Sequence, residues 1–558
     1  MLSEFQSKVN DLVTDSLSGY NPEKHAKEKS IRDAVWGTCR FYPWEVAILD
    51  SPLVQRLRDI RQTGLAYLVY PTSVHSRFDH TLGVTTISSR IVRSINDKHP
   101  SKKDPLISYE DHMRIRLSAL LHDVGHSCLS HVSETVFGAS HEFEELLIAV
   151  NEQFGVTPKP HEIMSWLIVQ SDRFKQFVED LVKKKILVGW DCAPEHIDQI
   201  AGNIIGYRKE PAEKYHADII NGPMDADKLD YLVRDAYFAG PTVVYDLDRF
   251  LYTVDAIEYP RGGIANSTGT KIVRLSIPIE GVTALEQIII SKLMLFSYLY
   301  HHHKIRCVEG MYHEVLKRWR ELPPSGPKGK RTLKLDHPVC FLSISDRSLF
   351  PGEWPPDMEK GDKVASEIVN RLVKRDLYKR ALVISRIFIP DIDTNPNAKN
   401  GFSKLLACAS SPQERETLRK QIFEEALRLM ASKPHKEHTK ELRRNFKIHH
   451  LLLDIPKSPT IEETEGVMVP ISTKAGSYET EFVPLTEIFP IEKWVDAYNA
   501  IKWRGHIFAA EEATGFVNLA AIDVLGKDPY HLRFTNQATG LCKIPRPDYV
   551  PTSLFAHL

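Results

Sequence analysis

Two short stretches of the sequence crowd titratable side chains more densely than a folded core tolerates without compensation. The first, HSRFDHTLGV at residues 75–84, contains His80. The second, LLHDVGHSCLSHVSE at residues 120–134, holds five such side chains within thirteen positions: His122, Asp123, His126, His131 and Glu134. Removing so many of these groups from water costs free energy, and a bound divalent cation is the commonest compensation. The sequence therefore predicts a metal centre that draws on both stretches.

The overall composition narrows the class of protein. The 558 residues are 42% hydrophobic and 26% charged, which indicates a globular chain of two to four domains. Lys and Arg (72) nearly equal Asp and Glu (73), so net charge gives no reason to expect a nucleic-acid partner. The seven cysteines form no CxxC pair, which argues against a disulfide scaffold or a zinc ribbon.

Neither the amino terminus nor the most apolar stretch resembles a targeting or membrane segment. The first twenty residues mix acidic and polar side chains into apolar positions and lack the basic start of a secretory signal. Residues 285–300 are interrupted by Glu286, Gln287, Ser291 and Lys292, so they predict a buried helix. We expect a cytoplasmic protein without a membrane partner.

Helical periodicity dominates the first part of the chain. Residues 1–30 predict a short helical extension, and residues 31–330 predict a mainly helical domain. Apolar side chains recur at intervals of three and four residues at Met113, Leu117, Leu120, Leu121 and Val124. We expect Gly125 to end this helix, with His122 and Asp123 on its last turn.

Strands are expected at two places. RFLYTVDAIEYP and TKIVRLSIPIE, at 249–260 and 270–280, predict a small β-hairpin within the helical domain. The basic loop at 323–334 is interpreted as a solvated linker and not as a phosphate-binding loop. Beyond it, residues 331–460 predict an α+β region, and residues 461–558 predict an extension packed on the helical core. The expected fold class is mainly α, with a C-terminal α+β region.

The predicted metal centre needs one more ligand than the two stretches supply. His80, His122 and Asp123 with a further carboxylate form a mixed imidazole and carboxylate set that suits iron, manganese, zinc or magnesium. The helical segment 221–240 offers Asp225, Asp227, Asp230 and Asp235. Of these we choose Asp227. The alternative is a polar core network that binds no metal.

Several motifs occur in an order that identifies a family resemblance. RFDH, HDVGHSCLSH and MDADKLDYLVRD follow one another, preceded by SPLVQRLRDIRQTGLAYLVYP at 51–71. Together they resemble the HD-domain phosphohydrolase superfamily, and within it the deoxynucleoside triphosphate triphosphohydrolases of the dGTPase type, which in animals also carry a sterile-alpha-motif domain. The resemblance covers more than half of the chain, weakens after residues 300–311, and implies that residues 31–330 form an HD catalytic domain.

The resemblance implies a role for each matching residue. The metal ligands would be His80, His122, Asp123 and Asp227. The catalytic network would contain His126, Glu134 and His141, with His131 near the leaving-group oxygen. The substrate contacts would be Arg77, Lys228 and Tyr231 for phosphate, Gln62 and Asp235 for the sugar hydroxyl, and Tyr300 beside sugar and base, with His302 as a further candidate.

The implied activity is metal-dependent hydrolysis of (deoxy)nucleoside triphosphates to (deoxy)nucleoside and triphosphate. It would control nucleotide pools and, in a bacterial source, could serve defence against phage. Arg77 and Lys228 would balance the charge of the triphosphate, because two imidazoles and two carboxylates leave a divalent ion nearly neutral. The alternatives are an HD phosphodiesterase or nuclease acting on another phosphoester, and a nucleotide-sensing subunit without turnover.

The sequence departs from the animal enzymes at informative positions. Thr63 stands where they have a leucine that crowds the sugar 2′ position, so the preference between deoxyribose and ribose stays open. Glu134 stands in place of an aspartate. Asp50, Gln55 and Arg58 match a regulatory nucleotide site, although Arg32 replaces one of its asparagines. Such a site implies an activating nucleotide and a homo-oligomer, as a dimer, tetramer or hexamer.

Overall fold

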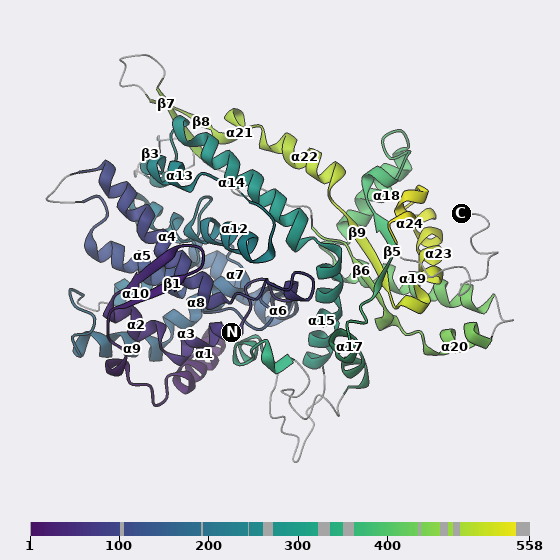
Figure 1. Ribbon diagram of the computed structural model, residues 1–558, viewed down its shortest axis with the longest axis horizontal. Coiled ribbons are helices and arrows are strands. Elements are labelled where there is room, and N and C mark those ends of the chain that lie inside the picture. Colours follow the sequence, from purple (N-terminus) through teal and green to yellow (C-terminus); the bar gives the residue numbers. More distant parts are fainter. Residues whose placement is uncertain are drawn as a thin grey trace. The chain divides into compact units, whose positions relative to one another are not determined.

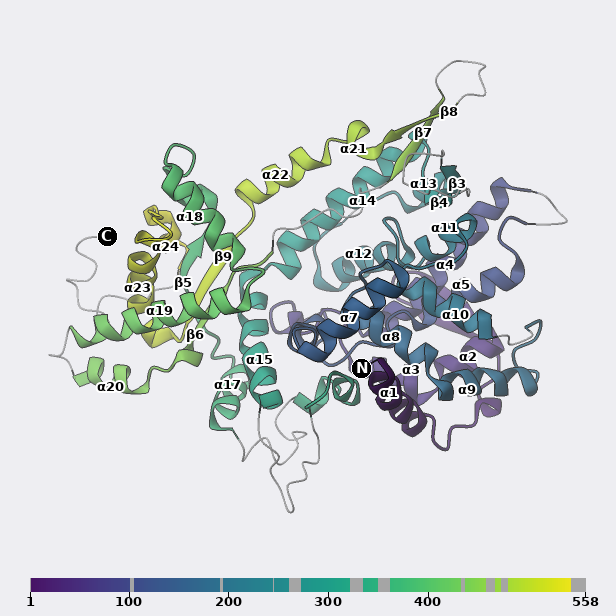
Figure 2. The same cartoon turned by 180° about the vertical axis from the view of Figure 1, so that it is seen from behind.

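The structure is a computed structural model in which the described residues are mainly helical, with only small antiparallel sheets (Figures 1 and 2). It describes residues 2–100, 105–190, 194–243, 245–259, 272–321, 335–349, 362–432, 437–457, 467–472 and 480–542. Contacts divide the chain into two compact units. Unit 1 contains Met1–Tyr300, Trp319–Asp357 and Ile461–Pro490, and unit 2 contains His301–Arg318, Met358–Thr460 and Ile491–Leu558. Each unit is thus built from three separate stretches of the chain, whereas the sequence predicted four consecutive segments.

Unit 1 is a helical domain with short hairpins. Its helices are α1 (Leu2–Ser16), α2 (Pro43–Leu49), α3 (Pro52–Gln55), α4 (Arg77–Lys98), α5 (Tyr109–Leu121), α6 (His131–Phe137), α7 (His141–Phe154), α8 (Pro160–Gln170), α9 (Asp172–Lys183), α10 (Pro194–Ile204), α11 (Lys214–Asp218), α12 (Ala226–Ala239), α13 (Leu247–Thr253), α14 (Val282–Leu295) and α21 (Leu485–Ile488). Its strands pair as β1 (Lys29–Asp33) with β2 (Gly37–Phe41), β3 (Asp255–Tyr259) with β4 (Ile272–Ser276), and β7 (Met468–Ser472) with β8 (Thr480–Pro484).

Unit 2 confirms the predicted α+β region. Strands β5 (Lys379–Ile384), β9 (Gly505–Ala509) and β6 (Leu451–Asp454) form an antiparallel sheet with β9 in the middle. Its helices are α17 (Lys363–Val373), α18 (Pro396–Ala407), α19 (Pro412–Ala431), α20 (Glu437–Asn445), α22 (Ile491–Ile501), α23 (Thr514–Gly526) and α24 (Asn536–Gly540), and α15 (His303–Glu321) belongs to both units. The apolar residues of β5 and β9 pack with α19 and α23 in one core.

The helix that carries the HDVGH motif forms as its pattern predicts. Ser108 caps α5 by accepting a hydrogen bond from the N–H of Asp111. Met113, Leu117 and Leu121 are at most 2% exposed, and each such burial stabilises the fold by about 1.5–3 kcal/mol. α5 packs against α4 and α10. It therefore presents its C-terminal end, where His122 follows, to the inside of unit 1.

Gly125 has a different role from the predicted one. α5 ends at Leu121, with His122 as its C-cap, so His122 and Asp123 lie just past the helix. Gly125 does not adopt the left-handed conformation of a helix-ending glycine. A Cβ there would lie 2.3 Å from the carbonyl oxygen of His161 and from the backbone nitrogen of Ser165 on α8. Glycine is needed because α8 passes directly against this loop.

The predicted hairpin is confirmed, with a shorter first arm. β3 and β4 pair antiparallel from Asp255 opposite Ser276 to Tyr259 opposite Ile272, and the turn between them lies outside the described residues. Residues 249–253, predicted as strand, belong to α13. The segment Ile279–Tyr300 is long and apolar enough to cross a membrane, and half of its most apolar window is buried, as in the core helix of a globular domain. Its α14 packs against α12 and α13.

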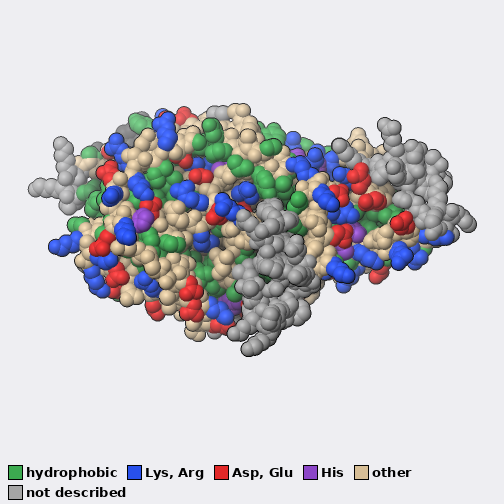
Figure 3. All heavy atoms as spheres, turned by 60° about the horizontal axis from the view of Figure 1, so that its bottom comes forward, with side chains coloured by type: hydrophobic (Ala, Val, Ile, Leu, Met, Phe, Trp, Pro, Cys, Tyr) green, Lys and Arg blue, Asp and Glu red, His purple; other side chains and the backbone are tan. Residues whose placement is uncertain are grey.

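The balanced charge of the sequence is visible at the surface. Figure 3 shows basic and acidic side chains interspersed over the face that it draws. This pattern agrees with 72 basic and 73 acidic residues in the chain. A mixed surface of this kind creates no long-range field of one sign, so any charge recognition depends on local groups.

Close approach between α4 and α12 depends on one glycine. A Cβ at Gly83 would lie 1.8 Å from Oδ1 of Asp230, so no other residue fits without moving α12. We expect Gly83→Ala to lower the free energy of unfolding by about 1–3 kcal/mol, because the added methyl group overpacks a buried contact. Thermal or urea denaturation measures this change.

Gly526→Ala is the matched control. Its Cβ would lie no closer than 3.7 Å to another residue, and it ends a helix without positive φ. We expect this variant to be neutral or slightly stabilised, because alanine favours helix. Equal stability of the two variants would contradict the close approach of α4 and α12.

Candidate metal centre and active site

His80 is fixed by the carboxylate of Asp230. It lies on the first turn of α4, which is capped by Ser76, and is fully buried. Burial opposes ionisation of Asp230, but Arg234 and His80 lower the pKa of its carboxyl to about 2. The ionised carboxylate can only accept, so Nδ1 of His80, 2.7 Å from Oδ2 of Asp230, donates to it. Nε2 of His80 is thereby directed away from Asp230.

His122 is fixed in the same way by the backbone. Its Nδ1 lies 2.7 Å from the carbonyl oxygen of Ala119, one turn earlier on α5. The carbonyl can only accept, so Nδ1 carries the proton and Nε2 keeps its lone pair. The carbonyl of His122 accepts a hydrogen bond of 2.6 Å from Oγ of Ser165, which ties the end of α5 to α8.

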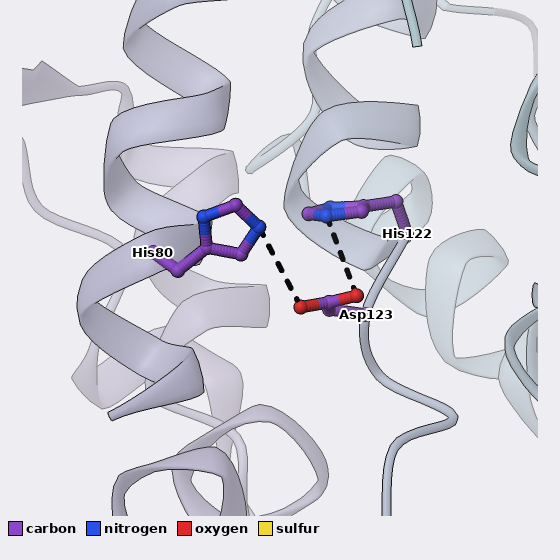
Figure 4. A group of neighbouring side chains, drawn as sticks. All are labelled: His80, His122 and Asp123. Atoms are coloured by element: carbon purple, nitrogen blue, oxygen red, sulfur yellow. Dashed lines mark ion pairs between the residues drawn. The ribbon is translucent and has the colours of Figure 1, made fainter. Parts of the chain in front are cut away.

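Both imidazoles face the carboxylate of Asp123 (Figure 4), and both also lie close to that of Asp227. Nε2 of His80 lies 2.9 Å from Oδ1 of Asp227 and 3.7 Å from Oδ2 of Asp123. Nε2 of His122 lies 3.4 Å from Oδ1 of Asp123 and 4.0 Å from Oδ1 of Asp227. The structure thus brings together four side chains from α4, the end of α5 and α12, although up to 147 positions separate them in the sequence.

This donor set fits a divalent cation. Both Nε2 atoms are buried and neither makes a hydrogen bond of good geometry among the described residues, although carboxylate oxygens lie 2.9 and 3.4 Å away. Two donors that each lie roughly 2.1 Å from one ion are about 3.0 Å apart at right angles and about 4.2 Å apart when opposite. The four distances fall close to this range. Two imidazoles and two carboxylates suit several divalent metals, and they do not distinguish among them.

Electrostatics favour a positive charge at the centre of this set. Burial opposes ionisation of Asp123, but Arg77 and His122 hold the pKa of its carboxyl well below the usual range. Burial opposes protonation of His80 as well, but Asp227 and Asp230 raise the pKa of its imidazole to about 10. A proton on Nε2 of His80 and a cation would occupy the same place. Binding of a cation here would therefore release a proton.

Arg77 connects this set to its surroundings. Its Nη1 donates to Oδ2 of Asp123 at 2.8 Å, and its Nε donates to Oγ of Ser130 at 3.0 Å. Its Nη2 lies 3.4 Å from the carbonyl oxygen of Gln62. The predicted phosphate-binding arginine thus lies beside the candidate metal ligands, and its guanidinium is hydrogen-bonded to Asp123.

A second cluster gathers three histidines around Glu134. Oε1 of Glu134 lies 2.8 Å from Nδ1 of His126 and 3.1 Å from Nδ1 of His161. Its Oε2 lies 3.1 Å from Nδ1 of His131. Burial opposes ionisation of Glu134, but His161, His131 and His126 hold the pKa of its carboxyl well below normal. One carboxylate is therefore shared by three imidazoles.

The three histidines differ in environment. Burial, Arg77 and His161 lower the pKa of His126 to about 4, so it is neutral near pH 7. Burial opposes protonation of His161, but Glu134 raises the pKa of its imidazole. The two rings stack at 4.0 Å, which explains why a charge on one disfavours a charge on the other. The His131 side chain is 66% exposed and can reach a substrate.

His161 occupies the place that the sequence analysis gave to His141. His141 is the first residue of α7; its side chain is 80% exposed, and its Nε2 lies 3.2 Å from Oε1 of Glu145. His161 is 5% exposed at the start of α8. The available signal was the apolar run IMSWLIVQ that follows His161, because it predicts a helix buried on all sides. His141 begins an amphipathic helix.

The predicted sugar-binding residues lie close together. Asp235 on α12 accepts hydrogen bonds from Nε2 of His75, at 2.7 Å, and from the hydroxyl of Tyr300. The carbonyl of His75 accepts the N–H of Gln62 at 3.0 Å. Oε1 of Gln62 is buried and has no hydrogen-bond partner among the described residues. His75, which the sequence analysis did not single out, thus links Gln62 to Asp235.

The remaining predicted substrate residues are placed as follows. Nζ of Lys228 donates to Oδ2 of Asp225 at 2.6 Å and to the carbonyl of Gly222 at 2.9 Å. Tyr231, on the same helix, lies near enough to Tyr300 to raise the pKa of its hydroxyl, an effect smaller than those of burial and Asp235. Oγ1 of Thr63 lies 2.9 Å from Oγ of Ser73. His302 belongs to unit 2.

The residues predicted for nucleotide regulation have partners within the chain. Asp50 lies 3.0 Å from Nδ1 of His25 and also pairs with Lys29. Gln55 accepts a hydrogen bond of 2.8 Å from Nε of Arg58, whose guanidinium lies over the ring of Phe78. Asp50 is the C-cap of α2 and Gln55 is the last residue of α3, so these contacts fit an ordinary structural role at helix ends.

Another group of possible metal donors lies in unit 2, and its hydrogen bonds show a different role. Nε2 of His450 lies 2.7 Å from Oε1 of Glu367, and Nε2 of His449 lies 3.3 Å from its Oε2. Nδ1 of His450 accepts the N–H of Lys447 at 3.2 Å. A neutral His450 then carries its proton on Nε2 and donates it to Glu367, which removes that lone pair from metal binding.

Comparisons with known proteins agree with this geometry. The HD domain model matches residues 77–232, from the start of α4 into α12, and the HD associated region model matches residues 270–400. The first match contains all four of the converging side chains. The chain thus contains an HD domain followed by an HD associated region. Among HD-domain relatives it is 32% identical over 231 residues to the deoxynucleoside triphosphate triphosphohydrolase SAMHD1 of Bos taurus.

Other relatives match a longer part of this HD-domain chain. Uncharacterized protein MJ1154 of Methanocaldococcus jannaschii is 29% identical over 375 residues, which are 66% of this chain and 62% of that protein. Uncharacterized protein YwfO of Bacillus subtilis is 26% identical over 368 residues, 64% of this chain and 69% of that protein. The SAMHD1 match covers 40% of this chain and 38% of that protein. The matches thus span less than two thirds of the length of MJ1154 and of bovine SAMHD1.

The convergence of the four side chains predicts a loss of bound metal in Asp227→Ala. Removing one of four donors should lower the affinity for manganese by more than the roughly 10- to 100-fold typical of an outer-shell partner. Metal content after dialysis and calorimetric titration measure it. Asp248→Ala, at a side chain that is 90% exposed on α13, serves as the control. Unchanged manganese affinity in Asp227→Ala would remove Asp227 from the ligand set.

Proposed function

We propose that the protein is a metal-dependent triphosphohydrolase that converts (deoxy)nucleoside triphosphates to (deoxy)nucleoside and inorganic triphosphate. The observation that carries this proposal is the pair of buried Nε2 atoms of His80 and His122, which face Asp123 and Asp227 without a hydrogen bond of good geometry among the described residues. The name of the SAMHD1 relatives supports the substrate class. The HD domain supports phosphoester hydrolysis.

His80, His122, Asp123 and Asp227 would hold the divalent ion, which would supply Lewis-acid activation of water and of a phosphate oxygen. Arg77, anchored on Asp123, places a planar cation beside the ligands and can pair with phosphate oxygens. Lys228 adds a second cation from α12, one residue after Asp227. Together they offset the charge of a triphosphate.

His131 is the best candidate to protonate the departing sugar oxygen. His126 has a pKa near 4 and is neutral at physiological pH, so it cannot donate a proton from an imidazolium. His131 is exposed enough to meet a substrate and is held by ionised Glu134 at 3.1 Å. The carboxylate of Glu134 can orient the ring of His131, as the partner of a proton-transferring histidine does. His161 takes the other side of Glu134 and adds to the effects of burial and Arg77 that keep His126 neutral.

Asp235, Gln62 and Tyr300 would bind the sugar. Oε1 of Gln62 is a buried acceptor that a sugar hydroxyl can satisfy, and Asp235 offers a carboxylate nearby, held by His75. A hydroxyl bound by such acceptors is strongly selected, because an analogue without it leaves them unpaired. We place this activity in cytoplasmic nucleotide-pool control by a homo-oligomer, with phage defence as a further role and an activating nucleotide at Asp50, Gln55 and Arg58.

Incubation of the purified chain with each dNTP and NTP and manganese tests the proposal. Inorganic triphosphate and nucleoside are the expected products. Pyrophosphate or monophosphate as products would assign the alternative of an HD phosphodiesterase acting on another bond. Nucleotide binding without turnover would assign a sensing subunit.

The presence of His161 instead of His141 beside Glu134 can be tested by mutation. We expect His161→Ala to lower kcat about 10²- to 10⁴-fold, because it removes a member of the proton-transfer network around Glu134. His141→Ala should keep wild-type kcat, because its side chain is 80% exposed and pairs with Glu145. Steady-state triphosphate release measures both, and the reverse order of effects would restore His141 to the network.

Thr63 allows a test of sugar selectivity. We expect Thr63→Leu to raise the ratio of kcat/KM for dGTP over GTP by up to roughly 100-fold, because an apolar wall disfavours the 2′-hydroxyl. Thr63→Val, which replaces the hydroxyl that meets Ser73 with a methyl group of similar size, separates bulk from hydrogen bonding. An unchanged ratio in both variants would show that Thr63 does not face the 2′ position.

A further inference from the structure

A single carboxylate from far along the chain reaches two loops of the candidate active site. Asp346 lies between the 3-10 helices η8 (Pro338–Ser343) and η9 (Arg347–Leu349) of unit 1, and its side chain is 3% exposed. Its Oδ1 accepts the backbone N–H of Leu129 at 2.6 Å, and its Oδ2 accepts the backbone N–H of Arg61 at 2.9 Å. Each oxygen therefore holds a different loop.

Both loops carry residues of the proposed reaction. Arg61 immediately precedes Gln62, and Leu129 lies two residues before His131. The loops are also joined directly, because Oγ of Ser130 donates to the carbonyl of Arg61 at 2.8 Å. Asp346 thus binds the backbone at the point where the sugar-binding loop and the histidine loop meet.

The histidine loop has a backbone that needs support. Leu129 and Ser130 have φ values of 56° and 51°, in the left-handed region that residues other than glycine rarely adopt. Two such residues in succession persist only when surrounding contacts hold them. Gly64 lies against the same point, since a Cβ there would be 3.1 Å from the carbonyl oxygen of Leu129. The hydrogen bond from Leu129 to Asp346 is one of the contacts that fix this turn.

Burial of the Asp346 carboxylate costs free energy, because the charged group loses its contact with water. Burial raises the pKa of Asp346 to about 6, and the N–H groups of Leu129 and Arg61 only partly offset this. Its ion pair with Nη1 of Arg61 is long, at 3.9 Å. A buried carboxyl group with so little charge compensation is poorly explained by stability alone, whereas its two backbone hydrogen bonds have a clear geometric effect.

We propose that Asp346 is a positioning residue of this active site, which holds the backbone of Leu129 against that of Arg61 so that His131 and Gln62 meet the same substrate. The inference rests on the proposed function. It also gives the HD associated region, which matches residues 270–400, a defined part in catalysis by a domain that matches residues 77–232.

Asp346→Asn tests the proposal, because it keeps the size of the side chain and turns one acceptor into a donor. We expect kcat for triphosphate release to fall about 10- to 100-fold, since small displacements of reacting groups have effects of this size. KM should change less than kcat, and bound manganese should equal that of the wild type. Deuterium uptake should rise in peptides that cover residues 57–64 and 124–133.

Asp336→Asn is the matched control, because Asp336 lies in the same segment and is exposed. It should keep wild-type kcat and deuterium uptake. A folded Asp346→Asn protein with wild-type kcat and wild-type uptake in both peptides would overturn the proposal. So would a loss of kcat that tracks a loss of bound manganese, because that shows general disruption of the site.

Asp346→Glu keeps the test decisive if Asp346→Asn does not fold. It retains both acceptors on an arm one methylene longer, so we expect retained manganese and a smaller fall in kcat; an unchanged kcat would count against the proposal. If the wild-type chain releases no triphosphate from any nucleotide, the proposed function fails by itself. Deuterium uptake of the two loops in Asp346→Asn and Asp336→Asn then decides whether Asp346 holds them.

Discussion

The hydrogen bond from Nδ1 of His80 to Asp230 is the interaction on which the rest of the site depends. It directs Nε2 of His80 toward Asp227, and without it the imidazole could turn its lone pair elsewhere. Asp230 is itself held by Arg234, whose Nε lies 2.8 Å from Oδ2 of Asp230 and whose Nη1 lies 2.8 Å from Asp33 at the end of β1. The orientation of the His80 imidazole on α4 is thus set by α12 and by the first hairpin.

Glu134 contacts three histidines whose environments differ. A single ionised carboxylate cannot raise the pKa of three adjacent imidazoles equally, because each protonated ring disfavours the next. Burial and Arg77 keep His126 neutral. Glu134, by contrast, raises the pKa of His161 although that imidazole is buried. The environment therefore assigns different protonation states to residues of the same type, which is how one site can supply both an acceptor and a donor of protons.

Much of the fold follows from local pattern. The α5 helix, the β3–β4 hairpin and the α+β character of the C-terminal region agree with periodicity and turn signals in the sequence. Other features depend on contacts between distant residues. The β1–β2 hairpin is short and was not expected, and Gly125 is glycine because α8 passes against it, which no local signal records. Residues 335–349 also belong to unit 1, and this depends on packing. Their local sequence contains no signal for the loops that Asp346 contacts.

The sequence by itself determined the kinds of donor, their order and the helices that carry them. Tertiary structure decided where each of these side chains lies and which groups it contacts. Four aspartates lie on or beside α12: Asp225 caps the helix, Asp227 faces His80 and His122, Asp230 orients His80, and Asp235 meets His75 and Tyr300. Spacing places Asp227 and Asp230 on one face of the helix, since residues three positions apart lie close together there, and Asp235 lies further round. Only the packing of α12 against α4 shows which of them meets a ligand nitrogen, and only the return of α8 brings His161, instead of His141, to Glu134.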